Sequence, residues 1–268
     1  MKEKKIISVG GIGGSGTRVI SKILKDIGYY TGGDLNVSED NLLFTLLFKR
    51  QNILTASEDE FESCVNIFVK LMSGAEPLNE NEKKLIESLA KNERTLHTKE
   101  WLEQRVQNIK SNKETKDWAW KEPNTHIVIE HLFRQIKNLK FVYVYRNGLD
   151  MAYSTNQNQL KLWGSIFFND YDLEVNPQNS LRYWCLTHKR MLKLKEKFTP
   201  NVMMLDFDRL CFYPNEVLSE LFDFIGCELE TKPYAELVNV PNSIGRHKEY
   251  SLEEFDSNDL SFISKIYE

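Results

Sequence analysis

The stretch GGIGGSGTRV, residues 10–19, decides the fold. It follows a short apolar run, IISV, and it opens a run with helical apolar periodicity, VISKILKDIG. These patterns predict a strand at about residues 5–10, a glycine loop, and a helix that ends at Gly28. Backbone N–H groups in such a loop, together with the helix N-terminus, bind anions. The stretch therefore predicts an α/β protein that holds a phosphate at this loop.

The loop fits two common nucleotide-binding patterns only in part. GIGGSG satisfies GxGxxG, which is typical of dinucleotide-binding proteins, but that class needs a second strand ending in an acid about 20 residues further on. Asp34 lies near that distance, yet YYTGG before it offers hardly any strand. GIGGSGTR also satisfies GxxxxG, but Thr17 and Arg18 replace the Lys and Ser/Thr of a nucleotide-triphosphate loop. The NTPase interpretation is therefore disfavoured, and a dinucleotide-binding oxidoreductase stays open.

Strand and helix patterns alternate along the rest of the chain. Apolar runs predict strands at three further places: 117–123, 139–146 and 201–207. Periodic runs predict helices from about Ser38, after Asn124, at about 180–197 and 214–226, and at the C-terminal end. Three polar helices are expected at 57–113, and a surface excursion at 162–179. The alternation predicts a parallel sheet flanked by helices, in a single domain over residues 1–268 with a helical insertion at about 57–113.

Composition narrows the classes of function. A net charge of −4 gives no overall attraction to nucleic acid or to an anionic membrane, so a phosphate site has to be local. The sequence has no signal-peptide pattern and no apolar run of about 18 residues, from which we expect no membrane span and a cytoplasmic location. The four cysteines show no CxxC spacing, which predicts free thiols, and no cluster predicts a metal site.

Basic residues follow the predicted strands at the edge where the glycine loop lies. Lys121 ends one short strand, in WKEP, and Arg146 ends the buried strand. Ser154 stands eight residues after Arg146, within the expected next helix, and Arg246 and Lys248 lie in a late loop. Ligands of parallel α/β sheets bind beyond the carboxyl ends of the strands. This arrangement predicts a ligand with more than one phosphate group.

Five segments together resemble the sulfotransferases that use 3′-phosphoadenosine 5′-phosphosulfate (PAPS). GGSGTR resembles their 5′-phosphosulfate loop, and FVYVYRNGLDMAYS resembles their 3′-phosphate motif of strand, Arg, turn, helix and Ser. WKEP is similar to a Lys-Asp-Pro segment of the protein-tyrosine sulfotransferases. LDFDRLCFYPNEVLSELFDFIG and NSIGRHK resemble the late segment and the C-terminal basic loop of the family. The resemblance implies a P-loop-like sulfotransferase architecture and transfer of a sulfuryl group from PAPS, with 3′,5′-ADP as product and no metal.

The resemblance also assigns residues that bind the nucleotide. The 5′-phosphosulfate residues are Gly13, Gly14, Ser15, Gly16, Thr17 and Arg18. Arg146 and Ser154 are expected at the 3′-phosphate, together with Arg246 and Lys248. Family members usually carry Lys or Arg where Gly14 stands here, so Arg18 or Lys121 would have to supply that charge.

The catalytic groups follow from the chemistry of the transfer. Lys121 is the expected electrophilic group, because it can neutralise the leaving phosphate; the plainer alternative is a salt bridge to Glu122. The expected base is a carboxylate after the first helix, with Asp40 ahead of Asp34 and Glu39. Asp40 would lie in the first turn of a helix, which is also a common stabilising position. A histidine base would have to be His97 or His126.

The acceptor stays open at this point. A hydroxyl or amine of a small molecule, a glycan or a peptide satisfies the same chemistry, with no nucleic acid among the expected partners. The oligomeric state is not indicated by the sequence. A non-catalytic nucleotide-binding module is the remaining alternative, because no residue in the sequence declares itself as the base.

Overall fold

The described residues form a sheet of four parallel strands in the order β2-β1-β3-β4. The structure is a computed structural model, and it describes residues 4–74, 76–91, 93–110 and 117–267. The strands are β1 (Ile6–Gly11), β2 (Trp118–Lys121), β3 (Leu139–Tyr145) and β4 (Val202–Asp206). All four lie where the apolar runs predict them, so the expected α/β class with a parallel sheet is confirmed.

The chain divides into two compact units. The first unit contains residues 1–10 and 17–141, and the second contains residues 11–16 and 142–268. The glycine loop therefore belongs to the second unit, although β1 precedes it and α1 follows it in the first. The expectation of a single domain over the whole chain stays a prediction.

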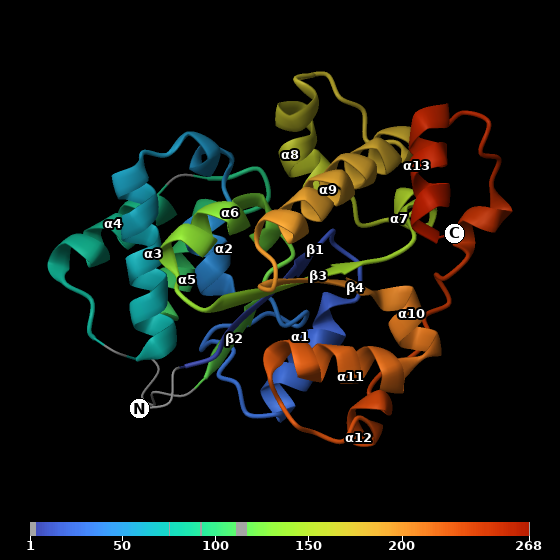
Figure 1. Cartoon of the computed structure of the whole chain (residues 1–268). Coiled ribbons are helices and arrows are strands. Elements are labelled where there is room, and N and C mark those ends of the chain that lie inside the picture. The colour runs from blue at the N-terminus through green and yellow to red at the C-terminus, as the bar shows by residue number, and fades with distance from the viewer. Residues whose placement is uncertain (1–3, 75, 92, 111–116, 268) are drawn as a thin grey trace. The chain divides into compact units, whose positions relative to one another are not determined.

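The first unit packs helices around β1 and β2. Its helices are α1 (Thr17–Asp26), α2 (Leu42–Phe48), η1 (Gln51–Thr55), α3 (Glu58–Ser73), α4 (Glu80–Ala90), α5 (Lys99–Gln107) and α6 (Thr125–Gln135). Helices α3, α4 and α5 are the three expected between 57 and 113, and α2 contacts all three (Figure 1). Residues 111–113 of that range lie outside the described residues. An aromatic cluster forms the core: Phe44, Phe48, Phe68, Trp118 and Trp120.

Helix α2 begins later than the sequence predicts. The prediction of a helix from about Ser38 is wrong, because the side chain of Asn36 accepts hydrogen bonds from the N–H groups of Ser38 and Asp40 and folds this segment as a turn. Asn41 is the N-cap, and its side chain accepts a hydrogen bond from the N–H of Phe44. Asp40 consequently lies before the helix and not in its first turn.

The second unit is built around the long helix α9. Its helices are α7 (Gly148–Ala152), α8 (Asn158–Phe168), α9 (Pro177–Lys197), α10 (Phe207–Phe212), α11 (Pro214–Ile225), α12 (Lys232–Ala235), η2 (Arg246–Glu249) and α13 (Ser257–Tyr267). Helix α9 contacts α7, α8, α13 and β4 (Figure 1). Asn176 caps its first turn and Pro177 occupies the first helical position, where a missing N–H costs nothing. Within the described ranges, no helix has the length and hydrophobicity needed to cross a bilayer.

Two predictions for residues 148–179 are wrong. Residues 162–168 belong to α8 and do not form a surface excursion, because Leu160, Leu162 and Trp163 are buried. Ser154 lies after the end of α7 and not within a helix. The side-chain amide of Gln157 donates to the carbonyls of Met151, Ala152 and Ser154, and so satisfies the end of α7.

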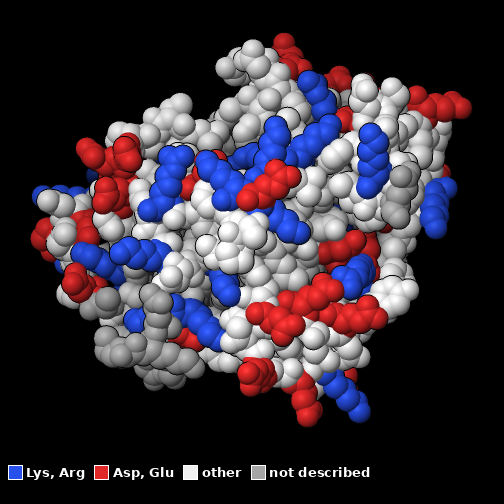
Figure 2. All heavy atoms as spheres, viewed as in Figure 1, with Lys and Arg blue, Asp and Glu red and all other residues white. Residues whose placement is uncertain are grey.

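Charge is distributed unevenly over the second unit. On the face shown in Figure 2, lysine and arginine side chains gather over α9, and acidic side chains gather over α10 and α11. The basic residues of the last turns of α9 include Lys195 and Lys197, whereas α11 carries Glu216 and Glu220. The net charge of −4 therefore averages over local fields of both signs.

Candidate active site

The glycine loop, residues 11–16, contains a buried hydroxyl without a hydrogen-bond partner in the described part of the chain. The N–H of Ser15 donates to the carbonyl of Ile12 (3.0 Å), and the amide of Gln159 donates to the carbonyl of Gly11 (2.9 Å). Ser15 is only 1% exposed, yet its Oγ has no hydrogen-bond partner among the described residues. Burying a polar group without a partner is costly, so such groups commonly mark a place where a ligand binds. Gly13 and Thr17 on either side are also buried.

Two glycines of the loop have backbone conformations that disfavour a side chain. Gly14 has φ +95° and Gly16 has φ +91°. Both values lie in the left-handed region, which favours glycine over residues with a side chain. At Gly16 a Cβ atom would also collide with the ring of Phe207, so the loop can approach this ring only without a side chain.

Gly16→Ala is expected to lower stability by at least about 2 kcal/mol, because it adds overpacking to backbone strain. The melting temperature should fall by roughly 5 °C or more, measured by circular dichroism. Gly28→Ala is the matched control: Gly28 has φ +99°, but nothing lies within 4 Å of its Cβ position, so this variant carries the strain alone. Equal losses in the two variants would show that the contact with Phe207 is unimportant.

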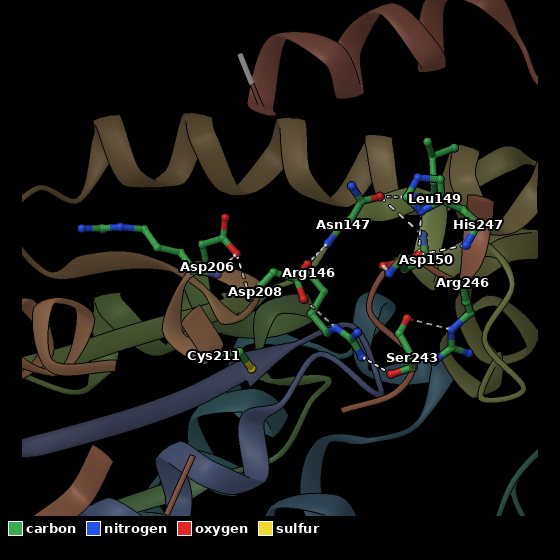
Figure 3. A network of polar contacts seen from close by, with 12 residues as sticks. Arg146, Asn147, Leu149, Asp150, Asp206, Asp208, Cys211, Ser243, Arg246 and His247 are labelled. Carbon is green, nitrogen blue, oxygen red and sulfur yellow. Dashed lines mark hydrogen bonds and ion pairs between the residues drawn. The ribbon is translucent and has the colours of Figure 1, made fainter. Parts of the chain in front are cut away.

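Arg146 follows β3, and its buried guanidinium lies between Asp208 and Ser243 (Figure 3). Its Nε donates to Oδ1 of Asp208 (3.2 Å), and its Nη1 donates to Oγ of Ser243 (3.1 Å). The residue is 4% exposed, and within the described part of the chain its Nη2 has no hydrogen-bond partner. The guanidinium is therefore fixed in orientation and keeps donors for an anion.

Asp208 braces this arginine, and Asp206 in turn holds the start of α10. Asp208 also accepts a hydrogen bond at Oδ2 from the N–H of Asn147 (2.8 Å), which ties the turn after β3 to α10. Asp206 is the N-cap of α10 and accepts from the N–H groups of Asp208 and Arg209. Burial raises the pKa of Asp206 above its usual range, because it disfavours the charged carboxylate.

Ser154 and the late basic loop complete this part of the second unit. The hydroxyl of Ser154 lies 3.8 Å from the position that a Cβ of Gly14 would take, and so borders the glycine loop. Arg246 donates through Nη1 to the carbonyl of Tyr153 (3.3 Å) and through Nε to the carbonyl of Ser243 (3.2 Å). The side chain of Lys248 is exposed. Four of the expected phosphate-binding elements thus belong to one unit, and Lys248 is the least constrained.

The first unit holds the buried Lys121 in an ion pair with Asp40. Lys121 is the last residue of β2 and is 4% exposed. Its Nζ donates to Oδ1 of Asp40 and to the carbonyl of Ser38 (3.0 Å).

 In the parallel register, Lys121 lies directly beside Val9, two residues before the glycine loop begins. Arg18 donates to Oγ of the same Ser38 (2.7 Å). Two basic side chains therefore converge on one residue of the 36–40 turn.

Asp40 is held from both of its oxygens. Its Oδ1 receives Lys121, and its Oδ2 accepts a hydrogen bond from the side-chain amide of Asn36 (2.8 Å). The sequence does not point to Asn36 or Ser38 as members of the site. The one signal that could have found Asn36 is its spacing, because an Asn two and four residues before Ser38 and Asp40 is typical of a side-chain-capped turn.

The two other candidate carboxylates have different partners. Nη1 of Arg105 donates to both carboxylate oxygens of Asp34 (3.1 and 3.2 Å), and the side-chain amide of Asn108 donates to Oδ1 (3.2 Å). Glu39 has φ +63° and lies 3.8 Å from Nζ of Lys25. Of the three candidate carboxylates, Asp40 is the one whose ion pair is with Lys121.

The plainer alternative for Lys121, a salt bridge to Glu122, is wrong. Glu122 is fully buried and pairs with Lys49 (3.2 Å) at the end of α2. It also accepts hydrogen bonds from the N–H and the side-chain amide of Asn124. Successive residues on a strand point to opposite faces, which is why Lys121 and Glu122 have separate partners.

Neither candidate histidine presents an ordinary imidazole base. Burial, together with the nearby charges of Lys49 and Arg94, lowers the pKa of His97 to about 4. Its ring stacks on Trp101. His126 is 0% exposed in α6. An acceptor molecule could not reach His126 without a rearrangement of the core.

The glycine loop lacks the lysine of a nucleotide-triphosphate loop, and the buried guanidinium after β3 keeps donors for an anion; in an α/β fold these two features point to the class of proteins that bind phosphorylated ligands. The family model described as "Sulfotransferase domain" matches residues 5–247. The chain belongs to this sulfotransferase family, and its activity is PAPS-dependent transfer of a sulfuryl group. The family match decides against the dinucleotide-binding oxidoreductase that the GxGxxG pattern left open.

The chain is similar to several solved structures at low sequence identity. The sulfotransferase domain of the Synechococcus PCC 7002 olefin synthase is 12% identical, with a TM-score of 0.55 over 100% of this chain and 97% of that chain. A Mycobacterium avium sulfotransferase, STF9, is 15% identical, with a TM-score of 0.49 over 98% of this chain and 76% of that chain. Retinol dehydratase in a complex with retinol and PAP is 13% identical, with a TM-score of 0.45 over 99% and 82%. A search of curated proteins found no match.

Proposed function

We propose that the second unit holds the nucleotide of PAPS, with the 5′-phosphosulfate at the glycine loop and the 3′-phosphate at Arg146. One observation carries this proposal: Ser15 Oγ and Arg146 Nη2 are buried, and neither has a partner among the described residues. Both are hydrogen-bond donors in a setting that suits phosphate oxygens. The chemistry of the donor set therefore fits a ligand with two phosphate-type groups.

Each group has a task in this proposal. PAPS, when bound, supplies a sulfuryl group attached to a phosphate that can leave. The N–H groups of the glycine loop and Ser15 bind the 5′ end, and the N-terminus of α1 adds a favourable dipole. Arg146, Ser154 and Arg246 bind and orient the 3′-phosphate, which fixes the register of the nucleotide.

The ion pair of the first unit is proposed as the catalytic pair. Lys121 Nζ stabilises negative charge on the leaving phosphate, and an Asp40 oxygen takes the proton of the acceptor. Asn36 supports this role, because it holds Oδ2 of Asp40 in one orientation. Arg18 donates a hydrogen bond to Ser38. In this proposal Arg18 supplies part of the positive charge that family members have from a Lys or Arg at the position of Gly14.

The acceptor is proposed to be a small molecule with a hydroxyl or an amine. The same experiment also tests glycan and peptide acceptors. The measurement is transfer of ³⁵S from labelled PAPS to pooled phenols, sterols, sugars and short peptides. Transfer to one pool would identify the acceptor class. Tight binding of 3′,5′-ADP with no transfer to any pool would instead favour the non-catalytic nucleotide-binding module.

Arg146→Ala is expected to weaken binding of 3′,5′-ADP by about tenfold to 100-fold, and to change binding of 5′-AMP far less. The reason is that Arg146 would contact only the 3′-phosphate. Isothermal titration calorimetry in EDTA measures both ligands. Arg209→Ala is the control, since Arg209 is half-exposed and pairs with Glu220 (2.7 Å) at the surface. Equal weakening of both ligands by Arg146→Ala would remove this residue from the 3′-phosphate.

A further inference from the structure

Asp150 is a buried carboxylate whose hydrogen bonds all lead to one distant loop. It lies in α7 and is 2% exposed. Its Oδ2 accepts from the N–H of Gly245 (2.7 Å), and its Oδ1 accepts from the N–H of His247 (3.0 Å) and contacts Nδ1 of the same imidazole (2.6 Å) (Figure 3). These partners stand 95 and 97 residues away along the chain. Both belong to the second unit.

The contacts keep this carboxylate ionised. Burial alone would raise the pKa of Asp150, but the hydrogen bonds from the N–H groups of His247 and Gly245 and from the imidazole outweigh it, so the pKa lies below its usual range. An ionised acceptor makes stronger hydrogen bonds than a neutral one. At neutral pH the loop is therefore fastened by a charge and not by a neutral carboxyl group.

The fastened loop carries residues of the proposed 3′-phosphate pocket. Arg246 stands between the two anchored residues, and its guanidinium donates to the carbonyls of Tyr153 and Ser243. The hydroxyl of Ser243 accepts a hydrogen bond from Nη1 of Arg146. The loop thus returns to the guanidinium whose Nη2 has no partner among the described residues.

We propose that Asp150 is a positioning residue for nucleotide binding: it fastens residues 243–247 so that Arg246 and Ser243 stay beside Arg146. The inference rests on the proposed function, because it concerns the same 3′-phosphate. Asp150 itself does not contact the nucleotide. Fastening acts through preorganisation, since a loop that is already ordered loses less entropy when the ligand binds. Its loss should therefore weaken ligands with a 3′-phosphate selectively.

The test compares Asp150→Ala and Asp150→Asn with the unchanged protein. Calorimetry gives the dissociation constants of 3′,5′-ADP and 5′-AMP, and their ratio measures preference for the 3′-phosphate. We expect Asp150→Ala to lower this preference by about tenfold, and Asp150→Asn to lower it less, because the amide oxygen can still accept one of the N–H groups. The KM for PAPS should rise in parallel, with a smaller change in kcat.

Asp256→Ala is the matched control. Asp256 is an exposed carboxylate that accepts from the N–H groups of Asn258 and Asp259 at the start of α13. Its loss removes two hydrogen bonds from the same unit, so it should lower the melting temperature and leave the preference unchanged. A purely structural role of Asp150 predicts this same behaviour, and a preference kept within about threefold in Asp150→Ala overturns the inference.

A second variant tests the inference if Asp150→Ala folds poorly. His247→Ala removes the imidazole contact and keeps both backbone hydrogen bonds, and hydrogen exchange of residues 243–248 reports how firmly the loop is held. Faster exchange together with a lower preference supports the inference, and faster exchange with an unchanged preference overturns it. If the unchanged protein itself shows no preference for 3′,5′-ADP over 5′-AMP, the proposed function fails, and this inference fails with it.

Discussion

Methionine in place of Lys121 is expected to lower kcat for sulfuryl transfer by about 10²–10³-fold, with a much smaller rise in KM for PAPS. The leaving phosphate gains charge as the bond to sulfur breaks, so a lysine that neutralises it acts mainly in the transition state. Met preserves most of the length of the side chain and removes the charge. Steady-state rates with the acceptor found by the ³⁵S screen measure both constants, and a change confined to KM would make Lys121 a binding residue only.

Loss of stability has to be separated from loss of catalysis in this variant. Lys121 is 4% exposed and its removal leaves Asp40 without its ion pair, which is destabilising in a buried setting. Lys49→Met is the matched control, because Lys49 makes a comparable buried pair with Glu122 in the same unit. Both variants should melt at lower temperature, but only Lys121→Met should lose kcat by the larger factor.

The sequence predicts an element correctly where a single hydrophobic pattern extends over the whole element. Residues 139–146 form a nearly continuous apolar run, and β3 occupies Leu139–Tyr145 with its central residues buried. The sequence does not predict α8, because NQLKLWGSIFF mixes aromatic, polar and glycine residues and has no clear polar face. It predicts too early a start for α2, because apolar periodicity does not show that the side chain of Asn36 competes with helix formation at Ser38 and Asp40.

The sequence predicts candidate residues for the site, but it does not predict which of them contact each other. Lys121 stood out by its place at a strand end, yet its partner Asp40 lies 81 residues earlier and no local pattern joins them. The same holds for Asp150, whose partners come from the late loop. Pairings of this kind depend on tertiary packing, which periodicity and spacing do not encode. Arg146 likewise pairs with a distant residue, Asp208, 62 positions later in the chain.

The 36–40 turn gathers two basic side chains that are far apart in the sequence. Ser38 accepts hydrogen bonds from Lys121 at its carbonyl and from Arg18 at its hydroxyl, so one residue holds two cations near each other in the first unit. Like charges repel, and Asp40 offsets part of that repulsion through its own ion pair with Lys121. A change at Asp40 is therefore expected to affect the position of Lys121 as well as the carboxylate itself.

Asp40→Asn is expected to lower kcat by about 10²–10⁴-fold, the range that is typical when a general base is lost. The amide has nearly the same shape and can still receive Lys121 at its oxygen, but it cannot take a proton. Asp34→Asn and Glu39→Gln serve as matched controls and should keep turnover within about tenfold, because these carboxylates pair with Arg105 and Lys25. Turnover and melting temperature are measured for all three variants.

A double variant, Asp40→Asn with Lys121→Met, separates a base from a residue that only holds Lys121. If Asp40 takes the proton, its loss should lower kcat further when Lys121 is already methionine. If Asp40 only positions Lys121, Asp40→Asn should have little further effect in the Lys121→Met protein. Full turnover in all three carboxylate variants would move the base elsewhere. His97 would then be tested first, although a pKa of about 4 makes it a weak base and His126 is buried in the core.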